Sequence, residues 1–294
     1  MAGALPLALD TGPDDAAATA PAVGRLRAVL PADFRGRVQS ARELARARRE
    51  EAAEHPPLPT AVPALDRLLA GGLPRAHLVE LVGARSSGRF STVLAALAAT
   101  TGVGEAAALV DLGDGLDPAA ALAAGVDLAR LLWLRPADLQ GALASAEIAL
   151  GAGFPLVALD LGPPPVRGGR GIEAAWLRLA RSARAHGAAL LVASPYRVSG
   201  TAATAVLRAD RARAVWQGGG ATPWLLGGAA TRLTIEKHRG TLPGQSAGLE
   251  LKTAECPPGT RIQTPAAPAA AAPRPRPAVW EELPEPRRAA GGRR

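Results

Sequence analysis

Short apolar runs alternate with helical segments between residues 60 and 255, and this alternation limits what the chain can fold into. Runs such as HLVELVG (77–83) and PLVALDLG (155–162) are apolar along their whole length rather than at every second residue. Strands of this kind are buried on both faces, as in a parallel sheet covered by helices. Segments with helical patterns, such as 91–100 and 171–187, separate these runs. The sequence therefore predicts an α/β core with a mostly parallel sheet and helices on both faces.

The end of this region follows a different pattern. The runs AVWQGG (214–219), TRLTIEKHRG (231–240) and LELKTAE (249–255) have no long helices between them, which predicts an antiparallel C-terminal extension of the sheet. Outside the core, composition divides the chain into segments. We expect a disordered N-terminal tail (1–20), an Arg-rich helical arm (21–56), the core itself (57–255) and a disordered Pro/Arg-rich tail (256–294).

Composition excludes several classes of protein. One cysteine cannot form an internal disulfide, and four histidines with one cysteine give little basis for a zinc site, so we expect no metal. No stretch of about 18 residues is uniformly apolar, which predicts no membrane-spanning helix. The first residues also lack the basic region of a secretory signal. A cytoplasmic protein is expected.

The charge balance has two readings. The net charge is +8, and of the 34 basic residues only Lys237 and Lys252 are lysines. Such a balance favours nucleic acid as a partner. A bias of the genome towards Arg and Ala is the first explanation for it, so DNA binding stays open.

A glycine-rich segment follows the run 77–83. Gly83 and Gly88 have the G-x-x-x-x-G spacing of a phosphate-binding loop, and a helix is predicted directly after them. Such a loop points backbone N–H groups at an anion, and the helix dipole adds to the attraction. The usual Lys and Ser/Thr are replaced by Arg89 and Phe90, and Ser91 lies one place too late, about 100° around the helix. The predicted, degenerate nucleotide or phosphate site consists of Gly83, Ser86, Ser87, Gly88, Arg89, Ser91 and Asp160.

Four segments in order resemble a RecA-type core, and together they cover roughly residues 60–255. LDRLLAGGLPRAHLVELVGARSSGRFS is similar to the opening of that core. VDLGDGLDPAAALAAG is similar to its Asp-Pro segment, PLVALDLG takes the place of the Walker B strand, and TRLTIEKHRGTLPGQ resembles a later strand and turn. The resemblance implies that Asp160 would hold a Mg²⁺ water in an active enzyme, whereas an ordinary acid at a strand end would cap the next turn. It also implies that Lys237 and Arg239 match basic positions used across a subunit interface, although a solvated strand edge is the alternative.

The departures from RecA concern its chemistry. Gly113 stands at the position of the catalytic Glu, with Asp114 the nearest acid, and Ser194–Pro195 replaces the Asn-Gln that senses the γ-phosphate. A general base must reach its water at hydrogen-bond distance, which Gly113 cannot do. The substitutions argue against useful ATP hydrolysis and leave weak, Mg²⁺-independent binding of ATP or phosphate as the expectation.

A RecA-like core without this chemistry, flanked by Arg-rich segments, resembles the ImuA family of RecA-related accessory proteins in error-prone translesion synthesis. The resemblance implies a non-catalytic role in the DNA damage response, with the RecA filament or a polymerase and clamp complex as partner. A divergent DNA-dependent ATPase and an SOS-type cell-division inhibitor are the alternatives. Trp280, between Val279 and the acids of the C-terminal tail, is a candidate docking residue, and an oligomer is left open.

Overall fold

The structure is a computed structural model. It describes residues 24–26, 28–35, 39–162, 171–219, 222–238 and 243–252, all within one compact unit that ends at Ala254. Within these residues, no helix combines the length and hydrophobicity needed to cross a bilayer. The two predicted tails, Arg239 and Trp280 lie outside the described residues.

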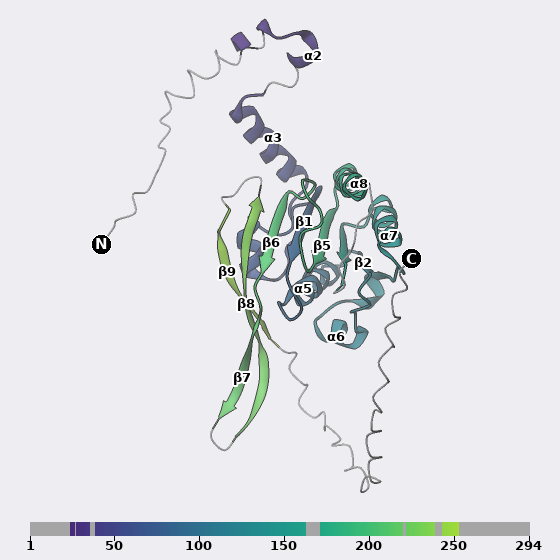
Figure 1. The fold of residues 1–294 in the computed structure, drawn as a ribbon, viewed down its shortest axis with the longest axis vertical. Coiled ribbons are helices and arrows are strands. Elements are labelled where there is room, and N and C mark those ends of the chain that lie inside the picture. Colours follow the sequence, from purple (N-terminus) through teal and green to yellow (C-terminus); the bar gives the residue numbers. More distant parts are fainter. Residues whose placement is uncertain are drawn as a thin grey trace, which may run out of the picture. The chain divides into compact units, whose positions relative to one another are not determined.

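One sheet of nine strands organises the unit, in the order β3-β2-β4-β5-β1-β6-β8-β7 with β9 paired to β8 (Figure 1). The strands from β3 to β6 in this order are all parallel, whereas β6, β7 and β9 each pair with β8 in antiparallel fashion. The prediction of a mostly parallel sheet with an antiparallel C-terminal extension is thereby confirmed. The strands are β1 (His77–Val82), β2 (Ala107–Asp111), β3 (Leu131–Leu134), β4 (Leu156–Asp160), β5 (Ala189–Ser194), β6 (Ala205–Ala209), β7 (Arg213–Gly219), β8 (Thr222–His238) and β9 (Ser246–Lys252).

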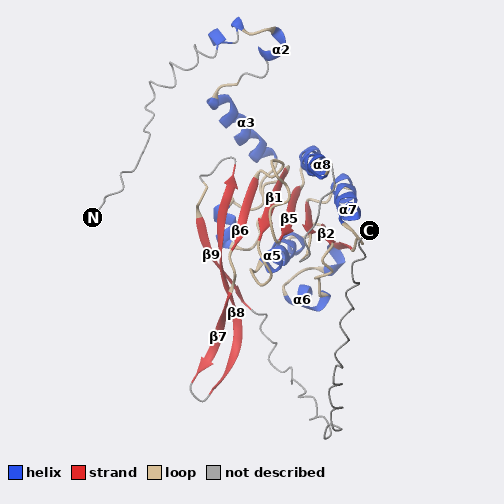
Figure 2. Ribbon diagram, viewed as in Figure 1, coloured by secondary structure: helices blue, strands red, loops and turns tan. Residues whose placement is uncertain are grey.

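Helices cover both faces of the parallel part (Figure 2). Helix α5 packs on one face, where Val79 and Leu81 of β1 belong to the core, and α7 and α8 pack on the other, with Leu78 and Val82. Alternate residues of one strand thus enter two different cores, which explains why the strands are apolar throughout. The helices are α2 (Ala32–Arg35), α3 (Ala41–Glu54), α4 (Pro63–Leu68), α5 (Arg89–Gly102), α6 (Pro118–Ala123), the short 3₁₀ helix η1 (Leu128–Arg130), α7 (Leu139–Gly151) and α8 (Ile172–Ala185).

The start of α3 shows how local sequence determines an element. Ser40 N donates to Glu43 Oε2 at 2.7 Å, and Glu43 N donates to Ser40 Oγ at 3.1 Å. This reciprocal pair is a capping box, which satisfies two N–H groups that the first turn of a helix leaves without partners. The side chains described on α3 are exposed.

Two elements differ from the sequence expectation. Strand β6 is not among the runs predicted from the sequence, yet it pairs in parallel with β1 through Val79↔Ala205 to Val82↔Arg208. Strand β8 begins at Thr222, well before the predicted start at residue 231, because its first part pairs with β7 from Arg213↔Ala230 to Gly219↔Thr222. Long β8 therefore serves both the sheet and a hairpin with β7.

Candidate functional site

The loop between β1 and α5 joins the carboxyl end of the central strand to a helix N-terminus. Its two glycines have different roles. A Cβ on Gly83 would lie 2.3 Å from Ser87 Oγ, so the turn closes only without a side chain. Gly88 is the N-cap of α5 and adopts a left-handed conformation with φ 83°, which favours glycine. The spacing noted in the sequence therefore forms a tight strand–loop–helix turn.

The serines of this loop take part in its own geometry. Ser87 is buried and its Oγ accepts a hydrogen bond from Arg89 N at 3.3 Å. Ser86 is exposed with φ 59°, and its carbonyl accepts from Ala212 N at 3.0 Å. Ser91 is exposed on the first turn of α5, whereas the half-buried Phe90 packs against the core. No hydroxyl therefore stands at the position of the usual Mg²⁺ ligand.

Arg89 turns inward instead of outward towards solvent. Its side chain is buried, one terminal nitrogen donates to Gly83 O at 3.0 Å, and the other lies 3.4 Å from Asp160 Oδ1. The guanidinium thus connects the first carbonyl of the loop to the tip of β4. An anion bound at this loop would have to compete with Asp160 for Arg89.

The contact between Arg89 and Asp160 is an ion pair without hydrogen-bond geometry. Arg89 Nε and Asp160 Oδ1 are buried and neither has a hydrogen-bond partner. The pKa of Asp160 is raised to about 6: burial is the main cause and the charge of Asp111 adds to it, while Arg89 and the Gly162 N–H act in the opposite direction. Burial also lowers the pKa of Arg89, against the pull of Asp160. Desolvation dominates for both partners, so the pair is imperfectly compensated.

The position predicted for a catalytic Glu is sterically closed. A Cβ on Gly113 would lie 2.6 Å from Gly162 Cα and 3.1 Å from Asp160 Oδ2. The backbones after β2 and β4 therefore touch where a carboxylate side chain would have to start. Glycine at residue 113 is required by this approach, and it supplies no general base.

The neighbouring acids bind other groups. Exposed Asp114 (φ 48°) forms two hydrogen bonds with Arg135, at 2.8 and 2.9 Å, which lower the pKa of Asp114. Buried Asp111 accepts from Gly115 N and Leu116 N at 3.0 Å each, and from an indole nitrogen, Trp133 Nε1, at 3.2 Å. Asp111 thus holds its own turn. Among the described residues around this loop, the acids and hydroxyls present do not fit a Mg²⁺–ATP complex.

Two other positions singled out in the sequence are Ser194 and Lys237. Ser194 supports the backbone of the loop, and Lys237 lies away from it. Ser194, at the sensor position, is buried at the end of β5; its carbonyl accepts from Gly83 N at 3.0 Å and its hydroxyl donates to Tyr196 O. Lys237, on β8, donates to Thr201 O at 3.3 Å. Its counterpart Arg239 is not described. The structure therefore brings Gly83, Arg89 and Asp160 together and leaves Lys237 apart from them.

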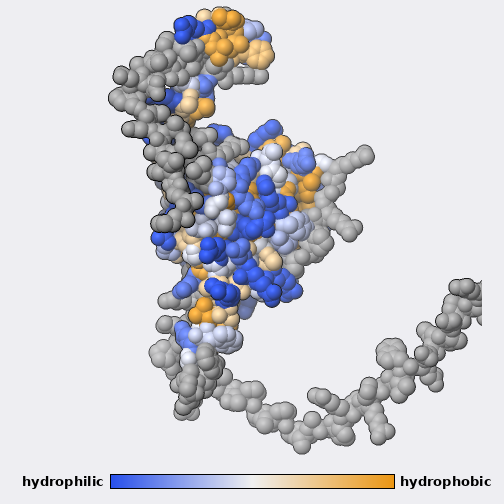
Figure 3. Space-filling view, turned by 60° about the vertical axis from the view of Figure 1, so that its left-hand side comes forward, coloured by the Kyte–Doolittle hydropathy of each residue, from blue (hydrophilic) through white to orange (hydrophobic). Residues whose placement is uncertain are grey.

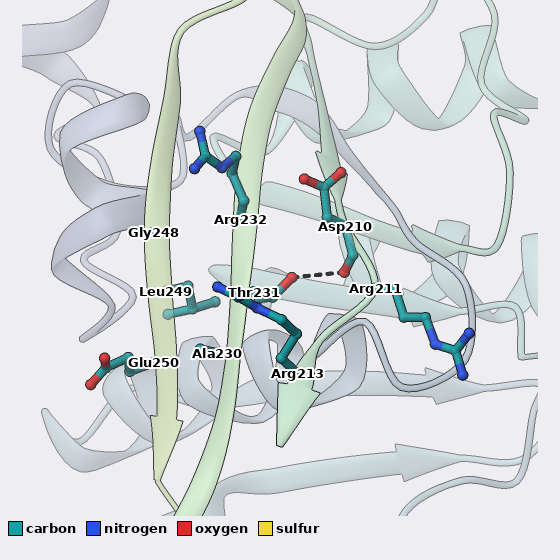
Figure 4. A pocket seen from close by; sticks show the side chains of 9 residues that line it. All are labelled: Asp210, Arg211, Arg213, Ala230, Thr231, Arg232, Gly248, Leu249 and Glu250. Atoms are coloured by element: carbon teal, nitrogen blue, oxygen red, sulfur yellow. Dashed lines mark hydrogen bonds between the residues drawn. The ribbon is translucent and has the colours of Figure 1, made fainter. Parts of the chain in front are cut away.

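A basic cavity beside the loop was not predicted from the sequence. It has a volume of about 450 Å³ and lies where the β6–β7 turn meets β8 and β9 (Figure 4). The hydrogen bond from Ala212 to Ser86 attaches this turn to the loop. Three arginines and two acids contribute its charges: Arg211, Arg213, Arg232, Asp210 and Glu250. The basic segment DRAR (210–213) could have indicated this cavity from the sequence, but only the pairing of β7 with β8 brings Arg232 to the same place.

Comparisons with known proteins agree with this architecture. Residues 45–160 match the RecA N-terminal domain family. The RecA protein of Picosynechococcus is 35% identical over 104 residues, covering 35% of this chain and 30% of that protein. The RecA protein of Synechocystis is 44% identical over 79 residues, covering 27% and 22%. The chain thus spans less than a third of the length of these relatives.

Among solved structures, the RadB recombinase superposes with a TM-score of 0.50 at 21% identity, covering 65% of this chain and 94% of that one. At this identity the likeness shows the fold. Residues 45–160 are RecA-like in sequence, and the core has a fold like that of RecA-type recombinases.

Proposed function

We propose that this RecA-like chain is a non-catalytic accessory protein of the DNA damage response, which supports error-prone translesion synthesis as ImuA proteins do. The observation that carries the proposal is the closed loop. Arg89 is paired with Asp160, and Gly113 packs against Gly162, so the polar groups of the loop serve the fold itself. Its activity then consists in binding partners, for which we propose the RecA filament or a polymerase and clamp complex.

ATP turnover tests the non-catalytic part of this proposal. We expect no hydrolysis above background with or without single-stranded DNA, and none in an Arg89→Lys/Phe90→Thr variant, because Gly113 still supplies no base. The RecA protein of Synechocystis, assayed under the same conditions, is the positive control. A turnover near about 1 s⁻¹, the lower end of ordinary enzymes, would support the divergent ATPase instead.

Binding of inorganic phosphate tests how the loop is closed. An anion at the N-terminus of α5 must draw Arg89 away from Asp160, so we expect weak binding that does not need Mg²⁺. An Asp160→Asn variant removes the competing charge and should bind phosphate about tenfold more tightly by calorimetry, a gain of about 1.4 kcal/mol. An Asp114→Asn variant removes an exposed acid that is paired elsewhere and serves as the control. Tight, strictly Mg²⁺-dependent ATP binding would contradict the proposal.

Damage-induced mutagenesis tests the accessory role in cells. Deleting the gene should lower mutation frequency after ultraviolet irradiation, and wild-type and Arg89→Lys/Phe90→Thr chains should restore it equally. Unchanged mutagenesis in the deletion strain would contradict the translesion role. Blocked septation on expression without DNA damage would instead favour a cell-division inhibitor.

The basic cavity favours DNA as an additional partner. Arg211 and Arg213 are exposed beside the loop, and exposed Arg232 lies across the same cavity (Figure 4). Each phosphate neutralised on single-stranded DNA adds about 0.7 to the slope of log affinity against log salt. Changing all three arginines to Gln should therefore weaken binding to an oligothymidine and lower this slope by about 2.

A matched control separates the cavity from net charge. Three arginines of α8 at positions 178, 181 and 184 carry the same charge on another surface. Changing these three to Gln should leave the slope nearly unchanged. Equal losses in the two triple variants would mean that general charge, and not the cavity, attracts DNA.

A further inference from the structure

The connection between β5 and β6 (195–204) crosses β1 without forming a helix. Parallel strands are usually joined by a helix that covers one face of the sheet. Here the connection lies on the same face as α8, where Ala202 enters the core beneath this helix and Val198 packs against it. A cavity remains between the connection and α8.

This cavity, the α8 cavity, has a volume of about 180 Å³ and lies at the amino end of β1, at the opposite edge of the sheet from the loop. It combines apolar with basic side chains: Leu177, Ala180 and Ala202 with His77, Arg181 and Arg184. None of the described residues that line it is acidic. The side of the molecule in Figure 3 is different, because hydrophilic atoms (blue) cover its middle and apolar atoms (orange) gather on the hairpin below. A ligand of the α8 cavity can therefore be recognised by apolar contact and by negative charge at the same place.

Hydrogen bonds hold the wall that the connection forms. Glu80, which is fully buried on β1, accepts from Val198 N at 2.5 Å and from the N and Oγ of Ser199. Further along the connection, Lys237 Nζ donates to Thr201 O at 3.3 Å. The α8 cavity therefore exists before any ligand arrives, and a preformed site loses less conformational freedom on binding.

The size and lining of the α8 cavity favour a protein side chain over a nucleotide or DNA. Pockets for small molecules and cofactors typically measure about 300–1,000 Å³, which is more than this cavity offers. DNA phosphates are bound by cations and N–H groups, and an apolar wall adds nothing to these contacts. Protein interfaces, in contrast, are often anchored by a side chain that fills a small pocket.

We propose that the α8 cavity docks a protein partner of this chain through one apolar side chain with carboxylates on its flanks. The apolar side chain enters between Leu177 and Ala202, and the carboxylates pair with Arg181 and Arg184. The charge of the lining selects the partner, because an acidic segment is attracted to this surface whereas a basic one is repelled. This docking surface rests on the proposed function, since it is the place where a non-catalytic accessory chain would hold its partner.

Photo-crosslinking in cells tests which molecule meets the α8 cavity. A benzophenone amino acid replaces Thr201, an exposed residue that lines the cavity, in the full chain, and the cells are illuminated after DNA damage. We expect a crosslink to one protein, at a segment with Asp or Glu beside the crosslinked residue. The same amino acid in place of Ile148, which is 72% exposed on α7 and outside the cavity, should not give this product. Crosslinks to DNA, to a segment without acids, or to nothing would overturn the proposal.

Charge reversal tests the role of the arginines, with the crosslinked protein in purified form. Arg181→Glu should weaken binding by about tenfold or more, because a like charge then faces the carboxylates of the partner. Arg178→Glu is the matched control, since Arg178 lies on the same helix, does not line the cavity and is paired with Glu147 at 3.8 Å. This control should change binding little, and circular dichroism confirms that both variants are folded.

A compensating change tests whether the two charges meet. Replacing the partner's acidic residue by Arg should restore binding to the Arg181→Glu chain. Unchanged binding of Arg181→Glu, an equal loss in Arg178→Glu, or no restoration would each overturn the proposal.

The identity of the crosslinked protein tests the proposed function separately. RecA, a polymerase or a clamp subunit would support both the docking surface and the proposed function. Another protein with an acidic segment would support docking at the α8 cavity and contradict the proposed choice of partner. RecA or a polymerase that binds the wild type and Arg181→Glu equally would support the proposed function and overturn the docking surface.

Discussion

The loop between β1 and α5 and the β7–β8 hairpin differ in which side chains they bury and which they expose. At the loop, charges and hydroxyls face inward: Arg89 lies on Asp160, and Ser87 binds the backbone of its own turn. On the hairpin, apolar side chains face outward, as Trp216 and Leu225 do. The loop has its polar groups engaged within the fold, whereas the hairpin leaves apolar surface uncovered.

This difference indicates where the chain can bind a partner. A bound ligand gains free energy from groups that the free protein leaves unsatisfied, and the hairpin has more of these than the loop. Arg89 Nε and Asp160 Oδ1 are the exceptions at the loop, and both are buried. We therefore expect the loop to bind ligands more weakly than its resemblance to an enzyme site suggests.

Gly113→Glu should have the largest effect on stability. The new side chain begins 2.6 Å from Gly162 Cα and 3.1 Å from Asp160 Oδ2, so it forces the backbones apart and places a second carboxylate beside the first. We expect a loss of about 4 kcal/mol in the free energy of unfolding and no gain of ATP turnover. Denaturant unfolding measures this, with Asp114→Glu on the exposed neighbour as a near-neutral control. A stable variant would show that the loop region is less closed than we infer.

Arg89→Ala should be the next most damaging change. Removing one partner leaves Asp160 buried without its counter-charge, which typically costs about 3 kcal/mol. An Arg89→Leu/Asp160→Leu double variant should recover most of that loss, because neither charge is then buried alone. Denaturant midpoints of the two variants check this. If the double variant is as unstable as Arg89→Ala, the pair contributes more than charge compensation.

Much of the fold follows from the sequence. Strands β1, β2, β4 and β5 lie between two helix layers, so burial on both faces leaves an apolar run that is visible without a structure. Strand β6 was missed because AVLRA is short and follows small residues and turn formers. Its position depends on pairing with β1, which is far away in sequence.

The position of the candidate site could be predicted from the sequence, but the directions of its side chains could not. Glycine spacing located the loop, and the residue types at 89, 90 and 113 showed that its chemistry was altered. The inward turn of Arg89 depends on Asp160, which belongs to another strand, and the need for glycine at residue 113 depends on Gly162. The exposure of Trp216 was not predicted either, because it depends on the register of β7 against β8.

The pH dependence of stability should show that Asp160 is buried at the loop, with a change of about 1 kcal/mol in the free energy of unfolding. The pKa of Asp160 is raised from 3.8 to about 6 in the folded chain, so between these values the folded state holds a proton that the unfolded state releases. Stability from this group therefore increases as pH falls from 7 to 5, by about 1 kcal/mol. The free energy of unfolding of the wild type, minus that of Asp160→Asn, should rise by this amount over that range.

Asp114 serves as the control for the pH series, because its pKa is shifted down whereas that of Asp160 is shifted up. Arg135 lowers the pKa of exposed Asp114, so the stability from Asp114 is lost as pH falls through that lowered value. Asp114→Asn should therefore leave the change between pH 7 and pH 5 intact. If the wild type and Asp160→Asn respond identically to pH, Asp160 is not the buried titrating group at the loop.

Charged substitutions on the hairpin should have the smallest effect on the stability of the single chain. Trp216 and Leu225 are more than half exposed, so Trp216→Glu and Leu225→Glu remove little packing within one copy. We expect the free energy of unfolding, measured by denaturant titration, to change by no more than about 0.5 kcal/mol. A loss of about 2 kcal/mol would instead mean that these side chains are packed within the fold, and the contrast between hairpin and loop would then disappear.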